Sequence, residues 1–267
     1  MRTFIIFFLL TISCFIANSQ EYQLAAIPPF NPGEEISFKA SIGFIKAAEA
    51  VFKTSDFIYN VNERPTYKMD IHAKTTGVFD IFSSVRDNWG SYFDTANFVP
   101  QKFYRYIKEG GYRKNEEFYF DHNLDSVVVA KLDKETRELE SEKAHAVPEN
   151  VQDMVSGYYY LRAIDFNQIK VGQVITIETF FDNELIPFKI KFVGREIIET
   201  KLGKLSALIL VPMMEKDSIF VEDNLRVWLS DDLNKIPLRV KAKIFLGHLV
   251  VDVDNVKNLR HQLALTQ

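Results

Sequence analysis

The sequence predicts an all-β protein with one central helix, in which a strongly curved antiparallel sheet takes a barrel-like, half-barrel or clam architecture. Apolar and polar residues alternate with a period of two in many short runs, turn-forming residues separate these runs, and one longer stretch has helical spacing. Parallel strands would need long crossovers, and no helices alternate with the predicted strands. An antiparallel meander is therefore expected.

Residues 1–19 have the pattern of a secretory signal peptide. Arg2 supplies a positive charge, Phe4–Ile16 is almost wholly apolar, and Ala17–Ser19 supplies small residues before a cleavage site. The apolar run is shorter than the roughly twenty residues of a membrane-spanning helix. We therefore expect cleavage before Gln20 and a location in the periplasm or outside the cell.

Cysteine usage predicts a mature fold without disulfides. Cys14 is the only cysteine, so the mature chain has no thiol nucleophile and no thiolate metal site. A lipoprotein signal that ends at Cys14 is the minor alternative, and it would anchor the protein to a membrane. Residues 20–267 contain no repeat and no low-complexity linker, so we expect one β-rich domain.

The composition favours an apolar interior over a nucleic-acid surface. The chain has 23 Phe, 11 Tyr and 2 Trp, which suit a thick β core or, alternatively, the lining of an apolar ligand cavity. Its formal net charge is −4. Because nucleic-acid binding needs a basic field, no nucleic-acid partner is expected.

The strand pattern is clearest in six runs, each of which places every second side chain on one face. These runs are 36–42, 175–181, 188–192, 225–230, 236–244 and 249–253. Glu109-Gly110-Gly111-Tyr112 is typical of a tight hairpin, and Asp182-Asn183 predicts another turn. Gly194, Gly203 and Gly247 are each expected to separate two strands.

One helix interrupts the strand pattern. Pro148 and Asn150 mark its predicted start, with Asn150 as the N-cap, and its apolar residues continue at helical spacing to Arg162. We expect this helix to cover one end or the open mouth of the sheet. A shorter helical turn is expected at 79–84, and the charged stretch 133–149 is expected to be a long loop.

Three groups of residues form a recognisable set. They are Asp153-Met154-Val155-Ser156 with Tyr159-Tyr160-Leu161-Arg162, Val227 to Asp232 with Pro237 and Gly247, and Pro32 to Phe38 with Ala48-Glu49-Ala50. Over about residues 30–255 the chain resembles an exported bacterial family known as domain of unknown function 3108. Ala48 departs from the glycine expected in relatives. The resemblance implies an exported β-rich domain and carries over no catalytic residue.

The sequence contains no set of residues typical of catalysis, so we predict neither an enzyme activity nor a cofactor. None of the five histidines has the spacing of metal ligands. Ser156 lacks the flanking glycines of a nucleophile elbow. Asp231 and Asp232 are adjacent, so an extended strand would point them to opposite faces, and formation of a turn explains them better.

Aromatic and cationic side chains are the candidate ligand contacts, because such residues supply much of the binding surface of pockets and interfaces. The candidates are Trp228, Tyr159, Tyr160 and Arg162. Trp228 alternates with aliphatic neighbours, so it faces water, a groove or the helix. Packing of Trp228 under Tyr159 or Tyr160 is the alternative to ligand contact.

Three functions remain as hypotheses. A binding or carrier module for an apolar or amphipathic molecule of the cell envelope is favoured, because curved β walls commonly hold one small ligand. The first alternative is an envelope structural or assembly factor that binds another protein through a sheet edge or the tyrosine-rich helix. The second is a metal-free hydrolase that uses carboxylates.

Overall fold

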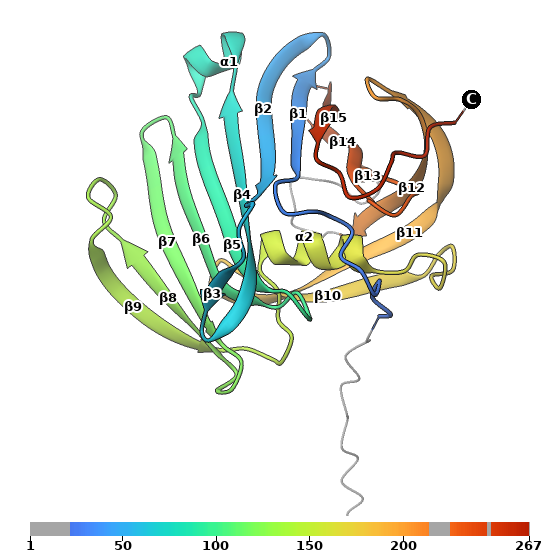
Figure 1. The fold of residues 1–267 in the computed structure, drawn as a ribbon. Helices are drawn as coiled ribbons and strands as arrows, with labels where there is room; N and C mark the ends of the chain where they lie inside the picture. The colour runs from blue at the N-terminus through green and yellow to red at the C-terminus, as the bar shows by residue number, and fades with distance from the viewer. Residues whose placement is uncertain (1–21, 214–224, 245–246, 267) are drawn as a thin grey trace, which may run out of the picture.

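The structure, a computed structural model, describes residues 22–213, 225–244 and 247–266 (Figure 1). The predicted signal peptide lies outside the described residues. Two helices are described, α1 (Gly77–Phe82) and α2 (Met154–Ala163). The described strands are β1 (Glu35–Ile42), β2 (Ile45–Thr54), β3 (Tyr59–Val61), β4 (Arg64–Thr75), β5 (Arg86–Asp94), β6 (Pro100–Glu109), β7 (Tyr112–Asp121), β8 (Ser126–Leu132), β9 (Leu139–Ala146), β10 (Val174–Phe181), β11 (Glu184–Thr200), β12 (Gly203–Met213), β13 (Leu225–Ser230), β14 (Pro237–Ile244) and β15 (Gly247–Lys257).

The strands form one antiparallel sheet that bends around α2, which confirms the predicted fold class. Their order is β10-β11-β12-β13-β14-β15-β1-β2-β4-β5-β6-β7-β8-β9, with β3 paired to β4. Figure 1 shows β10 and β11 passing beneath α2, between a wall that ends at β9 and a second wall that contains β12 to β15. Among the described residues β9 and β10 do not pair with each other, so the sheet is curved but open. The same residues contain no helix long and apolar enough to cross a membrane.

Side-chain contacts join the β10 end of the sheet to strands β5 to β7 across the concave side. Arg105 of β6 forms an ion pair with Asp182 in the β10–β11 turn, and its Nε donates to Glu116 of β7 at 2.7 Å. Trp89 of β5 stacks on Phe181 of β10 with ring centroids 5.9 Å apart. Because β10 stands at the far end of the strand order, these contacts fold the sheet back on itself.

Aromatic residues fill the space between α2 and the wall of β4 to β8. Buried members of this cluster are Phe30, Phe93, Phe98, Phe103, Phe118, Phe120, Tyr159 and Phe180. Phe30 meets Tyr159 edge-on at 4.7 Å between ring centroids, and Phe93 stacks on Tyr159 at 5.3 Å. Such offset and edge-on pairs add to the stabilisation that burial of the rings provides. The many phenylalanines therefore build a β core, as the composition predicted.

Residues that tolerate a positive φ angle form several of the turns between strands. Asp182 and Asn183 have φ of 51° and 67° and join β10 to β11, which suits a tight hairpin and confirms the predicted turn. The hairpin at Glu109–Tyr112 is confirmed, as are the strand boundaries at Gly203 and Gly247. The prediction that Gly194 separates two strands is wrong. It lies inside β11 with φ of 144°, at a shift of register that bends the strand.

The expectation of a loop over 133–149 is also wrong, because Leu139–Ala146 forms the edge strand β9. Almost every residue of β9 is exposed, so the alternation of apolar and polar residues that marks the other strands is missing. Charged edge strands are a common device against pairing with another chain.

The N-cap of helix α2 is Asp153, three residues later than the predicted N-cap Asn150. Asn150 has a φ of 62°, and the backbone N–H of Gln152 donates to Glu178 of β10 at 2.8 Å, which holds the intervening residues in an extended conformation. The Asp153 side chain then accepts from the backbone N–H groups of Val155 and Ser156 in a capping box. The short helix α1 begins two residues before its predicted position.

Removal of the charges from β9 should expose a pairing edge. With Glu140→Val and Glu142→Val, which lie on one face of β9, we expect concentration-dependent assembly, because an apolar unpaired strand templates pairing. Light scattering coupled to size exclusion measures the mass. The matched variant Glu140→Thr with Glu142→Thr keeps β propensity and polarity and should retain the wild-type mass. A valine variant that also keeps this mass would contradict the role assigned to the charges.

Candidate functional site

The concave side of the sheet contains an apolar cavity of about 360 Å³ against α2. Side chains from β1, β2, β4, β10 to β15 and α2 line it. Among them are Phe38, Phe52, Ile71, Ile190, Leu210, Val227, Val240 and Val251. Only Asp153, Tyr158 and Thr179 among the lining residues carry a polar side-chain group. A cavity of this size and chemistry has the properties of a site for one small apolar molecule.

The cavity wall follows from strand register. Leu210, Val227, Val240 and Val251 are successive cross-strand partners on β12 to β15, so their side chains form one row on one face. All four side chains border the cavity.

Helix α2 presents two different faces, because residues three and four apart share a side of a helix. Met154, Gly157, Tyr158 and Leu161 border the cavity. The opposite side, which includes Val155 and Tyr159, packs into the aromatic cluster. The helix thus closes one half of the concave side and leaves the other half open as the cavity.

Tyr159 and Tyr160, two of the predicted ligand contacts, lie away from the cavity. Tyr159 is fully buried, and its hydroxyl donates to the sulfur of Met69 at 3.1 Å. Burial raises the pKa of Tyr159 well above its usual range. Tyr160 is half-buried and packs between the aromatic cluster and the aliphatic core beside it. Both side chains hold the helix in place.

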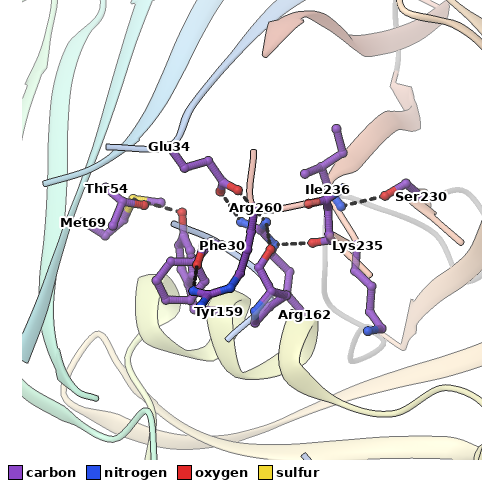
Figure 2. Close-up of polar contacts among 12 residues, drawn as sticks. Phe30, Glu34, Thr54, Met69, Tyr159, Arg162, Ser230, Lys235, Ile236 and Arg260 are labelled. Atoms are coloured by element: carbon purple, nitrogen blue, oxygen red, sulfur yellow. Dashed lines mark hydrogen bonds and ion pairs between the residues drawn. The ribbon is translucent and has the colours of Figure 1, made fainter. Parts of the chain in front are cut away.

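Arg162, the third predicted contact on the helix, is fully buried in an ion pair with Glu34 (Figure 2). Its Nη1 and Nη2 donate to the two Glu34 carboxylate oxygens at 2.6 and 3.0 Å. Nη2 also donates to the carbonyl of Pro29 at 3.1 Å, and Nε to that of Asn234 at 3.0 Å. Burial alone would lower the pKa of Arg162, but Tyr158 and Glu34 raise it through coulombic interaction. Arg162 is therefore a structural cation.

Trp228, the fourth candidate, lies in a different part of the molecule. It is buried in a cluster with Ile198 and Leu205 on the side of β13 opposite Leu229, so the expected packing under Tyr159 or Tyr160 is wrong. Its indole N–H donates to Glu196 of β11. It borders a separate groove of about 360 Å³ that is lined largely by cationic side chains. The structure thus does not bring the four candidates together.

Asp153 is the buried acidic group that borders the cavity. It accepts from the backbone N–H groups of Val155 and Ser156 at 2.6 and 2.9 Å and from the hydroxyl of Ser91 at 2.6 Å. Burial raises the pKa of Asp153 to about 6, although these hydrogen bonds act in the opposite direction. The sequence placed Asp153 in the helical region but gave no sign that the cavity would surround it.

The carboxylates proposed for hydrolysis have other partners. Asp231 pairs with Arg195 at 2.9 Å. Asp232 accepts from the Ser230 hydroxyl and from the backbone N–H of Asn234, at 2.7 and 3.0 Å, and so shapes the β13–β14 turn as predicted. Within the described residues no group of three or more His, Cys, Asp or Glu side chains is placed to hold a metal ion.

The protein belongs to the class of barrel-like β proteins. Its antiparallel sheet is open, curves around one helix and borders an apolar cavity. The model of the family described as "Protein of unknown function (DUF3108)" matches residues 36–254. The chain belongs to this family, as the resemblance in its sequence predicted. No curated protein matches it.

The comparison with solved structures finds matches at very low sequence identity. A β-barrel-like protein of domain of unknown function DUF1849 from Brucella abortus has a TM-score of 0.54 and 6% identity, over 86% of this chain and 99% of that one. A protein from Bacteroides fragilis NCTC 9343, described as exported and YmcC-like in fold, has a TM-score of 0.34 and 10% identity, over 85% and 98%. A protein from Parabacteroides distasonis ATCC 8503, described as a lipoprotein, has a TM-score of 0.33 and 11% identity, over 89% and 100%. The first of these supports the barrel-like fold.

Loss of the buried ion pair should destabilise the fold severely. Glu34→Gln leaves the Arg162 charge uncompensated in the interior, so the free energy of unfolding should fall by roughly 3–5 kcal/mol. Urea unfolding measures this change. Glu35→Gln is the matched control, because Glu35 pairs with the exposed Lys257 and should contribute less than about 1 kcal/mol. Equal effects of the two substitutions would contradict the role given to Arg162.

Stability should depend on the ionisation of Asp153. Because its folded-state pKa is about 6, above the unfolded value near 4, the folded protein binds this proton more tightly. The contribution of Asp153 to the free energy of unfolding should therefore fall by roughly 3 kcal/mol as the pH rises from about 4 to above about 6. Asp153→Asn keeps an N-cap residue but cannot ionise. Urea unfolding at a series of pH values should show wild type losing stability relative to the variant, and a difference that is constant with pH would contradict the assignment.

Proposed function

We propose that the protein binds and carries one apolar or amphipathic molecule of the cell envelope in the cavity beside α2. The observation that supports this proposal most directly is the lining of the cavity. Its volume of about 360 Å³ falls within the range of about 300–1,000 Å³ that is typical of small-molecule sites. Its surface comes almost entirely from aliphatic and aromatic side chains. Such a space favours hydrocarbon over water.

The few polar groups in the lining are engaged within the protein, so the cavity favours the hydrocarbon part of a ligand. Tyr158 borders the cavity, but its hydroxyl interacts with the buried Arg162 guanidinium. Asp153 is engaged by Ser91 and by the start of α2. We infer that the hydrocarbon part of the ligand lies against the valine and leucine row of β12 to β15.

The ligand class follows from the proposed location. We take residues 20–267 as one exported domain, in keeping with the predicted signal peptide and with the continuous sheet. Lipids and other amphipathic molecules are the apolar material available to a protein outside the cytoplasm. Transport in a cavity shields their hydrocarbon part from water.

The two alternative functions have less support. Assembly through a sheet edge would need an open strand, but β9 carries exposed charges and Gln152 covers part of β10. Hydrolysis by Asp231 and Asp232 would need free carboxylates, but Asp231 pairs with Arg195 and Asp232 accepts hydrogen bonds within the β13–β14 turn.

Filling the cavity should abolish binding without unfolding the protein. Ala50 of β2 borders the cavity, so Ala50→Phe should lower the affinity for a fluorescent naphthylamine probe by about tenfold or more. Val51→Phe is the matched control, because Val51 is the next residue on β2 and points to the other face. Fluorescence titration measures affinity, and circular dichroism confirms the fold.

Native mass spectrometry of protein purified from its own host tests for a resident ligand. We expect an added mass in the wild-type spectrum that Ala50→Phe removes and Val51→Phe retains. A bare protein mass together with no probe binding would overturn the proposed function.

A further inference from the structure

One end of the sheet displays large apolar side chains to solvent. They are Phe44, Ile45, Val78, Ile81 and Phe82, with exposed fractions of 108, 54, 50, 79 and 84%. We name this set the apolar tip. Exposed apolar residues that stand singly are normal, but contiguous groups of them mark sites of interaction.

The apolar tip comes from two segments that lie side by side. Phe44 lies in the β1–β2 turn and Ile45 begins β2, and the other three residues belong to α1 after β4. The backbone N–H of Thr76, which precedes α1, donates to the carbonyl of Ala47 at 2.9 Å. Figure 1 shows α1 beside the β1–β2 turn at the same end of the molecule. No residue of α1 is buried, so its apolar side chains do not contribute to the described core.

Two lysines that form no ion pair with a described residue lie at the same end of the sheet as the apolar tip. Lys46 follows Ile45 directly, and Lys243 stands opposite His248 on β14 and β15. The next pair on β15 and β1, Leu249 and Ile42, places these side chains at the same end of the sheet. Neither lysine makes an ion pair with any described residue.

Some acidic groups at this end are paired with cations and others are not. Asp80 of α1 pairs with Arg86 at 2.6 Å, and Glu49 of β2 pairs with Lys74 at 3.3 Å. Asp87 and Glu109 lie beside each other and form no ion pair with a described residue, but Lys108 and Arg113 of the β6–β7 hairpin offset their charge. Lys46 and Lys243 then leave a small local excess of positive charge among the described residues, on a chain whose net charge is −4. This local excess favours an anionic partner.

We propose that this end of the protein docks on the surface of an anionic lipid bilayer. Phe44, Ile81 and Phe82 insert at the boundary between headgroups and acyl chains, and Lys46 and Lys243 contact the headgroup phosphates. Apolar insertion combined with attraction to anionic lipids is the usual basis of binding at a membrane interface. This inference does not depend on a ligand in the cavity.

A second copy of this chain fits the apolar tip less well than a membrane. A twofold interface uses the same patch on both copies, so it brings each cationic rim against another. Juxtaposed like charges oppose association. The side chains also protrude from two separate turns, a shape suited to insertion into a soft surface.

Vesicle sedimentation tests the proposal. The protein is purified after export, so that a signal peptide cannot itself bind lipid. We expect it to sediment with vesicles that contain phosphatidylglycerol and to bind those of phosphatidylcholine at least about tenfold more weakly. High salt should weaken binding to the anionic vesicles, because it screens exposed charges.

Two variants separate the apolar and electrostatic parts. Phe44→Ser with Ile81→Ser and Phe82→Ser should lose binding to both kinds of vesicle, and Lys46→Gln with Lys243→Gln should remove the preference for phosphatidylglycerol. The matched control is Phe57→Ser with Ile58→Ser, two exposed apolar residues just past the other end of β2, and it should bind like wild type.

Three results would overturn the inference. The first is no sedimentation of wild type with anionic vesicles, and the second is full binding by the triple serine variant. The third is a dimer, seen by analytical ultracentrifugation, that the triple variant abolishes and that competes with vesicles. Ala50→Phe should bind vesicles like wild type, so failure of the cavity proposal would leave this result unchanged.

Discussion

The buried ion pair between Arg162 and Glu34 is the contact on which the arrangement of the molecule depends. It joins the end of α2 to the segment before β1, and the hydrogen bond from Arg162 to Asn234 adds the β13–β14 turn. These parts are far apart in the sequence, and the one cysteine of the sequence cannot form a disulfide that links them. A buried charge is costly unless every partner is in place. The pair therefore selects one position of the helix in the sheet, because any displacement of α2 would leave two charges unpaired in the interior.

The cavity is a consequence of that fixed position. With Arg162 held, Tyr159 on the neighbouring turn packs into the aromatic cluster, where its ring meets Phe30 and Phe93. The other side of α2 then faces the row of valine and leucine side chains on β12 to β15 across a gap that none of them fills. Native cores are close-packed, so a large unfilled volume in an otherwise dense interior calls for a reason. The packing that secures the helix on one side preserves the space on the other.

Local patterns carried enough information to predict the fold class but not the site. Period-two alternation identified strands such as β1, β10 and β14, because each has one buried and one exposed face. The edge strand β9 lacks that contrast and was missed. The candidate residues on α2 were chosen by type, and side-chain type does not say which face of a helix meets a neighbour. The ion pair of Arg162 cannot be read from its neighbours in the sequence, because its partner Glu34 lies 128 positions away. The wall of the cavity depends on register between strands, which no local pattern reveals.

The proposed membrane-docking end and the cavity are built on the same strands. Phe38 and Phe52 of β1 and β2 border the cavity, and the turn between these two strands carries Phe44. Strand β4 contributes Ile71 to the cavity and leads directly into α1. A continuous hydrogen-bonded ladder connects the two regions. Contact of the apolar tip with a bilayer would therefore fix the orientation of the cavity relative to the membrane. That geometry suits a carrier whose ligand leaves or enters the lipid phase, and it gives a role to the phenylalanines exposed at the end of the central strands.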